Sequence, residues 1–191
     1  MARRRRRVEP TRLLAEGTRP HVSSHLLAAE RVVSLADFTS PGLIIPRLQG
    51  RDAATVIREL CAVLQREAGV PDLLPFYHAA LNREFLFSTA MGHGLAIPHA
   101  RVSGLARLSF ALGRSAEPLV WVPKGRPPVR LVFLCAVPAT EATAYLLLSS
   151  SLARLAKEPR WLKTLLEADG ASEMLDALRQ VTLRAVAPAA L

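Results

Sequence analysis

The sequence predicts one α/β domain in which helices cover both faces of a β-sheet. The chain has 191 residues, of which 50% are hydrophobic and 21% charged, enough for a single domain with a full core. The segment VRLVFLCAV at 129–137 is almost continuously apolar, which is typical of a strand in mid-sheet with both faces covered. Apolar residues recur at helical spacing before and after this strand. These observations predict a helix–sheet–helix architecture.

The first part of the domain contains a short strand and two helices. The segment GLIIP at 42–46 favours a strand, and the next helix is expected to start near Asp52 and to end near Gly69. A second helix should start near Pro71 and Asp72 and end around 85–87, because proline is favoured in a first turn. Its expected buried face consists of Leu73, Leu74, Tyr77, Ala80 and Leu81.

Short apolar segments separated by glycine and proline then predict a series of strands. They lie at 95–97, 108–112, 119–122 and 129–137. Helical spacing of Tyr145, Leu148, Leu152 and Leu155 predicts a helix after the last strand. Pro159 should open a further helix, and Ser172 is the expected cap of a terminal one.

The two ends of the chain are expected to lie outside the domain, which we place at 35–185. Residues 1–34 form a basic arm and residues 186–191 a tail. The formal net charge is +9, and five of the positive charges come from Arg3–Arg7. Such a charge block favours a solvated, flexible terminus over a nucleic-acid-binding segment.

The composition also limits location and cofactor chemistry. Residues 8–22 are too often interrupted by polar residues and proline for a secretory signal, and the apolar runs are shorter than the ~20 residues of a membrane span. We therefore expect a cytoplasmic protein. Cys61 and Cys135 are isolated and read as core residues. A metal site made of His78, His93 and His99 lacks supporting ligand spacing, so we expect no metal or cofactor.

The segment NREFLFSTAMGHGLAIPHAR at 82–101 carries the candidate chemistry. Gly92 and Gly94 permit turns whose backbone N–H groups can face an anion. Pro98 disfavours a helix before it, so 95–97 should be a strand that presents His99 stiffly. A neutral imidazole is available as a nucleophile at physiological pH. We expect His99 to carry a phosphoryl group.

Charged oxygens on a phosphoryl group require cationic and hydrogen-bond donors. Arg83 and Arg101 are the candidate cations. Ser88 and Thr89 either donate to the same oxygens or close the turn with their hydroxyls. His93 either reaches this pocket or is solvated in its loop.

The same segment resembles the signature of the IIA components of the bacterial sugar phosphotransferase system, of the fructose/mannitol type, including the nitrogen-regulatory IIA proteins. An R-E pair, an S-T pair, G-x-G and A-I-P-H occur in that order in this family. They match Arg83 and Glu84, Ser88 and Thr89, Gly92 and Gly94, and the range 96–99. The likeness extends from about Leu35 to Leu178 and includes GLIIPRL, PVRLVFLCAVP and LLEADGASEMLDAL.

This resemblance implies a mixed sheet flanked by helices on both faces. It also implies that His99 accepts a phosphoryl group from a small histidine-phosphorylated carrier protein, with Arg83 as charge partner. The phosphoryl group would then pass to a IIB component, or the chain would act on a regulatory target protein.

One position departs from the family pattern. A second histidine is usual near the start of the helix after the V-P strand end, but Tyr145 occupies the matching position and no histidine follows His99. Tyr145 either substitutes as a hydrogen-bond donor or packs in the core. The alternative function is therefore a degenerate regulatory binding module with weak or no phosphorylation.

Overall fold

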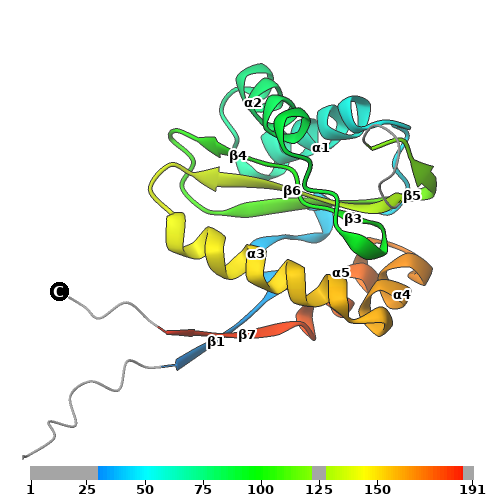
Figure 1. Ribbon diagram of the computed structural model, residues 1–191. Coiled ribbons are helices and arrows are strands. Elements are labelled where there is room, and N and C mark those ends of the chain that lie inside the picture. The colour runs from blue at the N-terminus through cyan, green and yellow to red at the C-terminus, as the bar shows by residue number, and fades with distance from the viewer. Residues whose placement is uncertain (1–29, 122–127, 187–191) are drawn as a thin grey trace, which may run out of the picture.

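A computed structural model describes residues 30–121 and 128–186 and shows a mixed sheet between two helical layers (Figure 1). The sheet has five strands in the order β2-β5-β6-β3, with β4 also paired to β6. The pair β5 and β6 is antiparallel, whereas β2 on β5 and both β3 and β4 on β6 are parallel. The strands are β2 (Ile44–Ile45), β3 (Leu95–Ala96), β4 (His99–Val102), β5 (Ser109–Leu119) and β6 (Val129–Pro138). The predicted α/β fold with a mixed sheet is confirmed.

Helices α1 (Ala53–Ala68) and α2 (Leu73–Leu86) cover one face of the sheet (Figure 1). The predicted ends of α1 are confirmed: the Asp52 carboxylate accepts the Thr55 N–H at 2.9 Å, and Gly69 ends the helix with a φ of 71°.

The predicted buried face of α2 is confirmed in part. Ala80 is buried, and Leu73, Tyr77 and Leu81 pack partly buried against the core. Leu74 is instead 59% exposed, and Phe76 and Glu84 are buried although they were not predicted to be. The prediction relied on apolar side chains alone. Phe76, Ala80 and Glu84 are spaced four residues apart, so they lie on one face of the helix, which points to the core. Glu84 can be buried there because its carboxylate accepts the hydrogen bonds described below.

Strand β6 separates the two cores. Val132, Leu134 and Ala136 pack in the core on the α1–α2 side. Phe133 and Cys135 point to the opposite core, which packs against the second helical layer. That layer consists of α3 (Ala142–Lys157), α4 (Pro159–Glu167) and α5 (Ala171–Arg179). The predicted central position of this strand is confirmed.

Three local predictions need adjustment. Residues 119–121 do not form a separate strand, because β5 itself runs on to Leu119 after a register irregularity beyond Arg114; Val122 lies outside the described residues. Ser172 lies inside α5, and Gly170 occupies the N-cap position. Residues 99–102, which were not expected to be a strand of their own, form β4.

A two-stranded ribbon joins segments from near both ends of the chain. Strand β1 (Glu30–Ser34) pairs antiparallel with β7 (Thr182–Val186), and Figure 1 shows this ribbon below α3. The last residues of the expected arm are thus a strand, whose partner is distant in sequence. The rest of that arm and residues 187–191 lie outside the described residues. In the described part of the chain, no helix has the length and apolar character needed to cross a membrane.

Candidate functional site

His99 is the first residue of β4, and its side chain faces α3. Along this short strand Ala100 and Val102 are buried in the α1–α2 core, so the alternating residues His99 and Arg101 point to the other side. The His99 side chain is partly exposed, which leaves the ring accessible. Within the described sheet β4 pairs only with β6, so His99 lies at an edge.

A backbone hydrogen bond orients the imidazole of His99. Its Nδ1 lies 3.2 Å from the carbonyl oxygen of Ile97. Because a carbonyl oxygen can only accept, Nδ1 must carry the proton, and Nε2 of the neutral ring keeps its lone pair. Burial lowers the pKa of His99, the bond to Ile97 opposes this shift, and the charge of Arg83 adds to it. The neutral, nucleophilic form is therefore favoured.

Arg83 lies near the end of α2, beside the site. Its Nη1 donates to the Phe87 carbonyl oxygen at 2.7 Å, and its guanidinium carbon is 5.7 Å from the centre of the Phe87 ring. Its positive charge lowers the pKa of both His99 and Tyr145. The structure thus brings together the predicted pair of His99 and Arg83.

Tyr145, in the first half of α3, is in contact with His99. The two ring centroids are 5.0 Å apart, with an angle of 35° between the planes. Burial raises the pKa of Tyr145 to about 12, so the phenol stays protonated at neutral pH. The side chain is half-buried and also packs against the core beneath α3. Both interpretations of Tyr145 therefore have structural support.

A buried carboxylate organises the turn between α2 and β3. Glu84 is 1% exposed and accepts hydrogen bonds from the Thr89 N–H, from the hydroxyls of Ser88 and Thr89, and from the Trp121 indole N–H. The Thr89 hydroxyl oxygen accepts the Ile97 N–H at 3.0 Å. Through Ile97, whose carbonyl orients His99, this network supports the site.

This network changes the interpretation of two predicted phosphate ligands. Both hydroxyls donate to Glu84, and Ser88 also accepts the Ala90 N–H at 3.2 Å. Ser88 and Thr89 therefore close the turn, which was one of the two alternatives. The roles of Glu84 and Trp121 were not predicted from the sequence. The R-E pair singles out Glu84, but no residue close to Trp121 in the sequence indicates that its indole N–H donates to Glu84.

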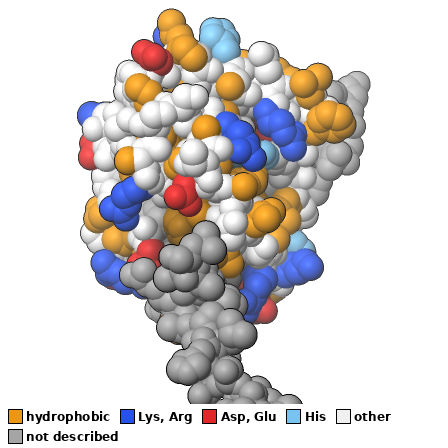
Figure 2. Space-filling model, turned by 90° about the vertical axis from the view of Figure 1, so that its left-hand side faces the viewer, with side chains coloured by type: hydrophobic (Ala, Val, Ile, Leu, Met, Phe, Trp, Pro, Cys, Tyr) orange, Lys and Arg blue, Asp and Glu red, His pale blue; other side chains and the backbone are white. Residues whose placement is uncertain are grey.

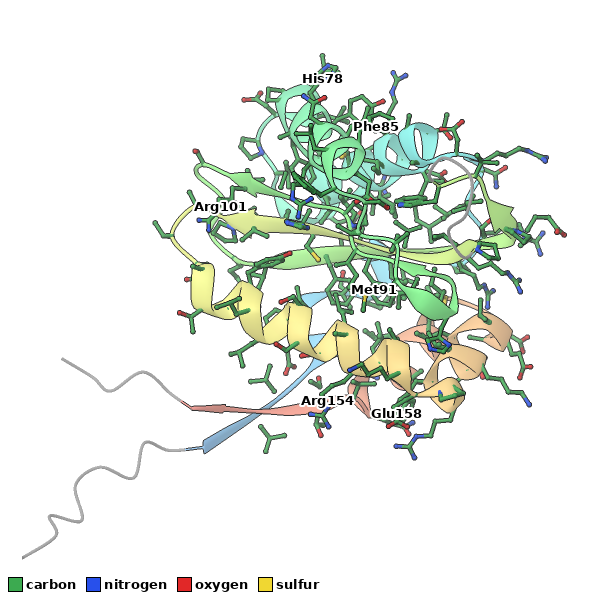
Figure 3. All side chains as sticks on the ribbon, viewed as in Figure 1. His78, Phe85, Met91, Arg101, Arg154 and Glu158 are labelled. Atoms are coloured by element: carbon green, nitrogen blue, oxygen red, sulfur yellow. The ribbon has the colours of Figure 1, made fainter. Side chains whose placement is uncertain are left out.

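The glycine turn does not form a phosphate cradle at His99. Leu95, directly after Gly94, pairs with Leu131, whereas His99 pairs with Cys135, four positions and about 13 Å farther along β6. Gly94 has a φ of 81°, and a Cβ there would lie 3.0 Å from the Pro128 carbonyl oxygen. Gly94 is thus needed for a close backbone approach. Figure 3 shows Arg101, on the strand of His99, near the start of α3. Met91, which directly precedes the glycine turn, lies well away from Arg101 in the same view.

The remaining candidate residues from the sequence either lie away from His99 or are exposed beside it. His93, with a φ of 71°, borders a hollow of about 570 Å³ together with Arg130 and Lys163. His78 is exposed on α2 and points away from the sheet (Figure 3). Arg101 is exposed on the same side of β4 as His99, and its Nη1 donates to the Ala139 carbonyl oxygen at 3.0 Å.

The surface near the site combines basic and apolar side chains. Figure 2 shows basic side chains beside a partly visible histidine, with apolar groups around them. Four large apolar side chains close in sequence to Arg83 or Tyr145 are solvent-exposed: Phe85 by 63%, Leu86 by 73%, Phe87 by 72% and Leu146 by 64%. Phe87 also contacts the Arg83 guanidinium.

Curated relatives include transport and regulatory proteins. The chain is 30% identical over 133 residues to the PTS system fructose-specific EIIABC component of Bacillus subtilis, covering 70% of this chain and 21% of that protein. It is 29% identical over 124 residues to a nitrogen regulatory protein of Bradyrhizobium diazoefficiens, covering 65% of this chain and 80% of that protein.

Solved structures share the fold. The nitrogen regulatory protein IIA-Ntr of Neisseria meningitidis superposes with a TM-score of 0.65 at 26% identity, covering 75% of this chain and 98% of that one. IIA mannitol of Escherichia coli superposes with a TM-score of 0.63 at 19% identity, covering 73% and 97%. Residues 37–181 match the family described as phosphoenolpyruvate-dependent sugar phosphotransferase system, EIIA 2. The chain therefore belongs to the EIIA 2 family of the sugar phosphotransferase system.

Proposed function

We propose that this chain is a phosphohistidine carrier that accepts a phosphoryl group on Nε2 of His99 from a small histidine-phosphorylated carrier protein. The observation that carries this proposal is the hydrogen bond from Nδ1 to the Ile97 carbonyl. It assigns the ring proton to Nδ1 and leaves the Nε2 lone pair for attack. Membership of the EIIA 2 family supports the same role.

The transfer needs no proton movement at His99. The Nε2 lone pair forms a bond to phosphorus while the N–P bond of the donor breaks, and that electron pair returns to the donor's imidazole. Nδ1 keeps its proton and its bond to Ile97 throughout. Arg83 offsets the charge on the phosphoryl oxygens, because its guanidinium has donors beyond the one bonded to Phe87.

The phosphoryl group then passes to a IIB component, or the phosphorylation state of the chain regulates a target protein. The contact with these partners is assigned to the surface around His99, where Arg101 is exposed and Phe87, which contacts Arg83, is 72% exposed. In this role the chain would act in the cytoplasm together with its donor.

The test is phosphorylation in a reconstituted system. The protein is incubated with phosphoenolpyruvate and the general phosphotransferase proteins, and its intact mass is measured. We expect one acid-labile phosphoryl addition that is lost in His99→Ala. His78→Ala is the matched control, because His78 is an exposed histidine on α2, and it should be phosphorylated like the parent. An addition that persists in His99→Ala contradicts the assignment.

A second candidate function is a regulatory binding module in which phosphorylation is weak or absent. The observation that favours it is Tyr145, which lies against His99 where the family usually has a second histidine. Absence of phosphoryl addition to the parent protein, with a donor shown to phosphorylate another IIA protein in the same mixture, would support the module over the carrier.

A further inference from the structure

The contact between His99 and Tyr145 has a chemical consequence that rests on the proposed function. The ring centroids are 5.0 Å apart, and both side chains are partly exposed. A group attached to His99 at the edge of the sheet therefore enters space that Tyr145 borders. The phenol has a hydroxyl donor at its tip, beyond the ring that packs against the core.

The charged and titratable groups around this pair are few. Arg83 and Glu84 act on the pKa of His99 from α2, and Cys135 and Arg83 act on the pKa of Tyr145. On β4, Arg101 is exposed and donates to Ala139. Burial raises the pKa of the Cys135 thiol, which therefore stays neutral, and Glu84 is occupied by its own hydrogen bonds. The cations Arg83 and Arg101, which each have further donors, and the neutral phenol of Tyr145 remain to meet phosphoryl oxygens.

We propose that Tyr145 is a catalytic residue of the transfer, whose hydroxyl donates a hydrogen bond to a phosphoryl oxygen while the group is bound to Nε2 of His99. The donor's N–P bond breaks, the Nε2–P bond forms, and the phenol keeps its proton. Tyr145 thus stabilises developing negative charge without adding a positive charge to the site.

This arrangement predicts a flat pH profile at and above neutrality. A phenol with a pKa of about 12 remains a donor up to alkaline pH. His99, whose pKa is lowered, remains neutral at pH 7 and above. A histidine at position 145 would instead change its charge near its usual pKa of about 6.5. The rate of phosphoryl uptake should therefore be constant between about pH 7 and pH 9.

The first experiment compares two tyrosine-to-phenylalanine variants in the reconstituted system. The chain has two tyrosines, and each lies beside a histidine. The ring centroids of Tyr145 and His99 are 5.0 Å apart, and those of Tyr77 and His78 are 5.2 Å apart. Tyr145→Phe keeps the ring and removes the hydroxyl, and it should slow phosphoryl uptake by His99 about tenfold. Tyr77→Phe should match the parent. Equal rates in Tyr145→Phe and Tyr77→Phe would overturn the proposal.

The second experiment measures pH dependence, with the rate of each Tyr145 variant divided by the parent rate at the same pH to cancel the pH dependence of the donor proteins. The Tyr145→Phe ratio should stay flat, whereas the Tyr145→His ratio should show an inflection near pH 6.5. A purely packing role for Tyr145 predicts no inflection in Tyr145→His, and that result also overturns the proposal. A parent protein that takes up no phosphoryl group refutes the proposed function itself, whatever the variants do.

Discussion

At the residue scale, the state of His99 results from opposing effects of its neighbours. Burial and the charge of Arg83 lower its pKa, whereas the hydrogen bond to Ile97 and the charge of Glu84 raise it. The net lowering keeps the ring neutral at physiological pH. In the proposed transfer, the same guanidinium that favours the neutral imidazole would also stabilise the negative charge of the phosphoryl group.

Replacing Arg83 by alanine should raise the pKa of His99. A nearby positive charge disfavours the protonated imidazole, so its removal makes protonation easier. Titration of the histidine ring signals by NMR measures this pKa directly. Arg101→Ala is the control: Arg101 is also a cation on this side of the protein, but its charge is not among the causes of the His99 shift, so the pKa should stay unchanged. An unshifted pKa in Arg83→Ala would remove Arg83 from the site.

The sequence singles out the candidate site residues but not all of their partners. His99 and Arg83 could be chosen as candidates, because a histidine directly after a proline and a nearby cation are local features. The roles of Ser88, Thr89 and Gly94 could not be assigned in the same way. Their hydrogen bonds and close contacts involve Glu84 and Pro128, and tertiary packing decides which partner each group meets.

At the element scale, the turn after α2 couples a helix to the strand that carries the site. Glu84 on α2 binds Thr89, and Thr89 binds Ile97 just after β3. The Trp121 indole N–H, from beyond β5, donates to the same carboxylate at 2.8 Å. One buried side chain therefore satisfies donors from two separate segments, which makes it costly to remove.

Glu84→Ala should lower the free energy of unfolding by about 3 kcal/mol, because it leaves several buried donors without a partner. Glu84→Gln retains one acceptor oxygen and should cost about 1 kcal/mol. Urea unfolding followed by circular dichroism measures both. Glu173→Ala is the comparison, because the exposed Glu173 carboxylate accepts the Asp169 N–H in a surface bond. If Glu84→Ala cost no more than Glu173→Ala, the network would not be a stabilising element.

The elements themselves differ in how far sequence could predict them. Both ends of α1 are set by local signals, the Asp52 cap and the left-handed Gly69. The pairing of β1 with β7 brings together segments about 150 residues apart, and no local pattern indicates it. On α2 the burial of Glu84 could not be predicted, because Glu84 owes it to hydrogen bonds from outside the helix.

At the scale of the whole molecule, the site joins two helical layers across the sheet. Arg83 comes from α2 on one side and Tyr145 from α3 on the other, and His99 lies on β4 between them. Adjacent residues of β6 face the two cores: Leu134 faces the α1–α2 side and Phe133 the opposite side. A chain of this size with two cores sharing one sheet should unfold as a single cooperative unit.

A substitution on one face should therefore be detected on the other. Trp121 is buried in the α1–α2 core, whereas Trp161 packs beside the second core. In a Trp161→Phe background, Trp121 fluorescence reports the α1–α2 layer alone. Phe133→Ala should lower the free energy of unfolding by about 4 kcal/mol, and Leu134→Ala by about 3 kcal/mol. Both should shift the Trp121 transition in urea, and circular dichroism should give the same midpoint. If Phe133→Ala left the Trp121 transition in place, the layers would unfold independently, and a site held between them would lose its geometry whenever either one loosened.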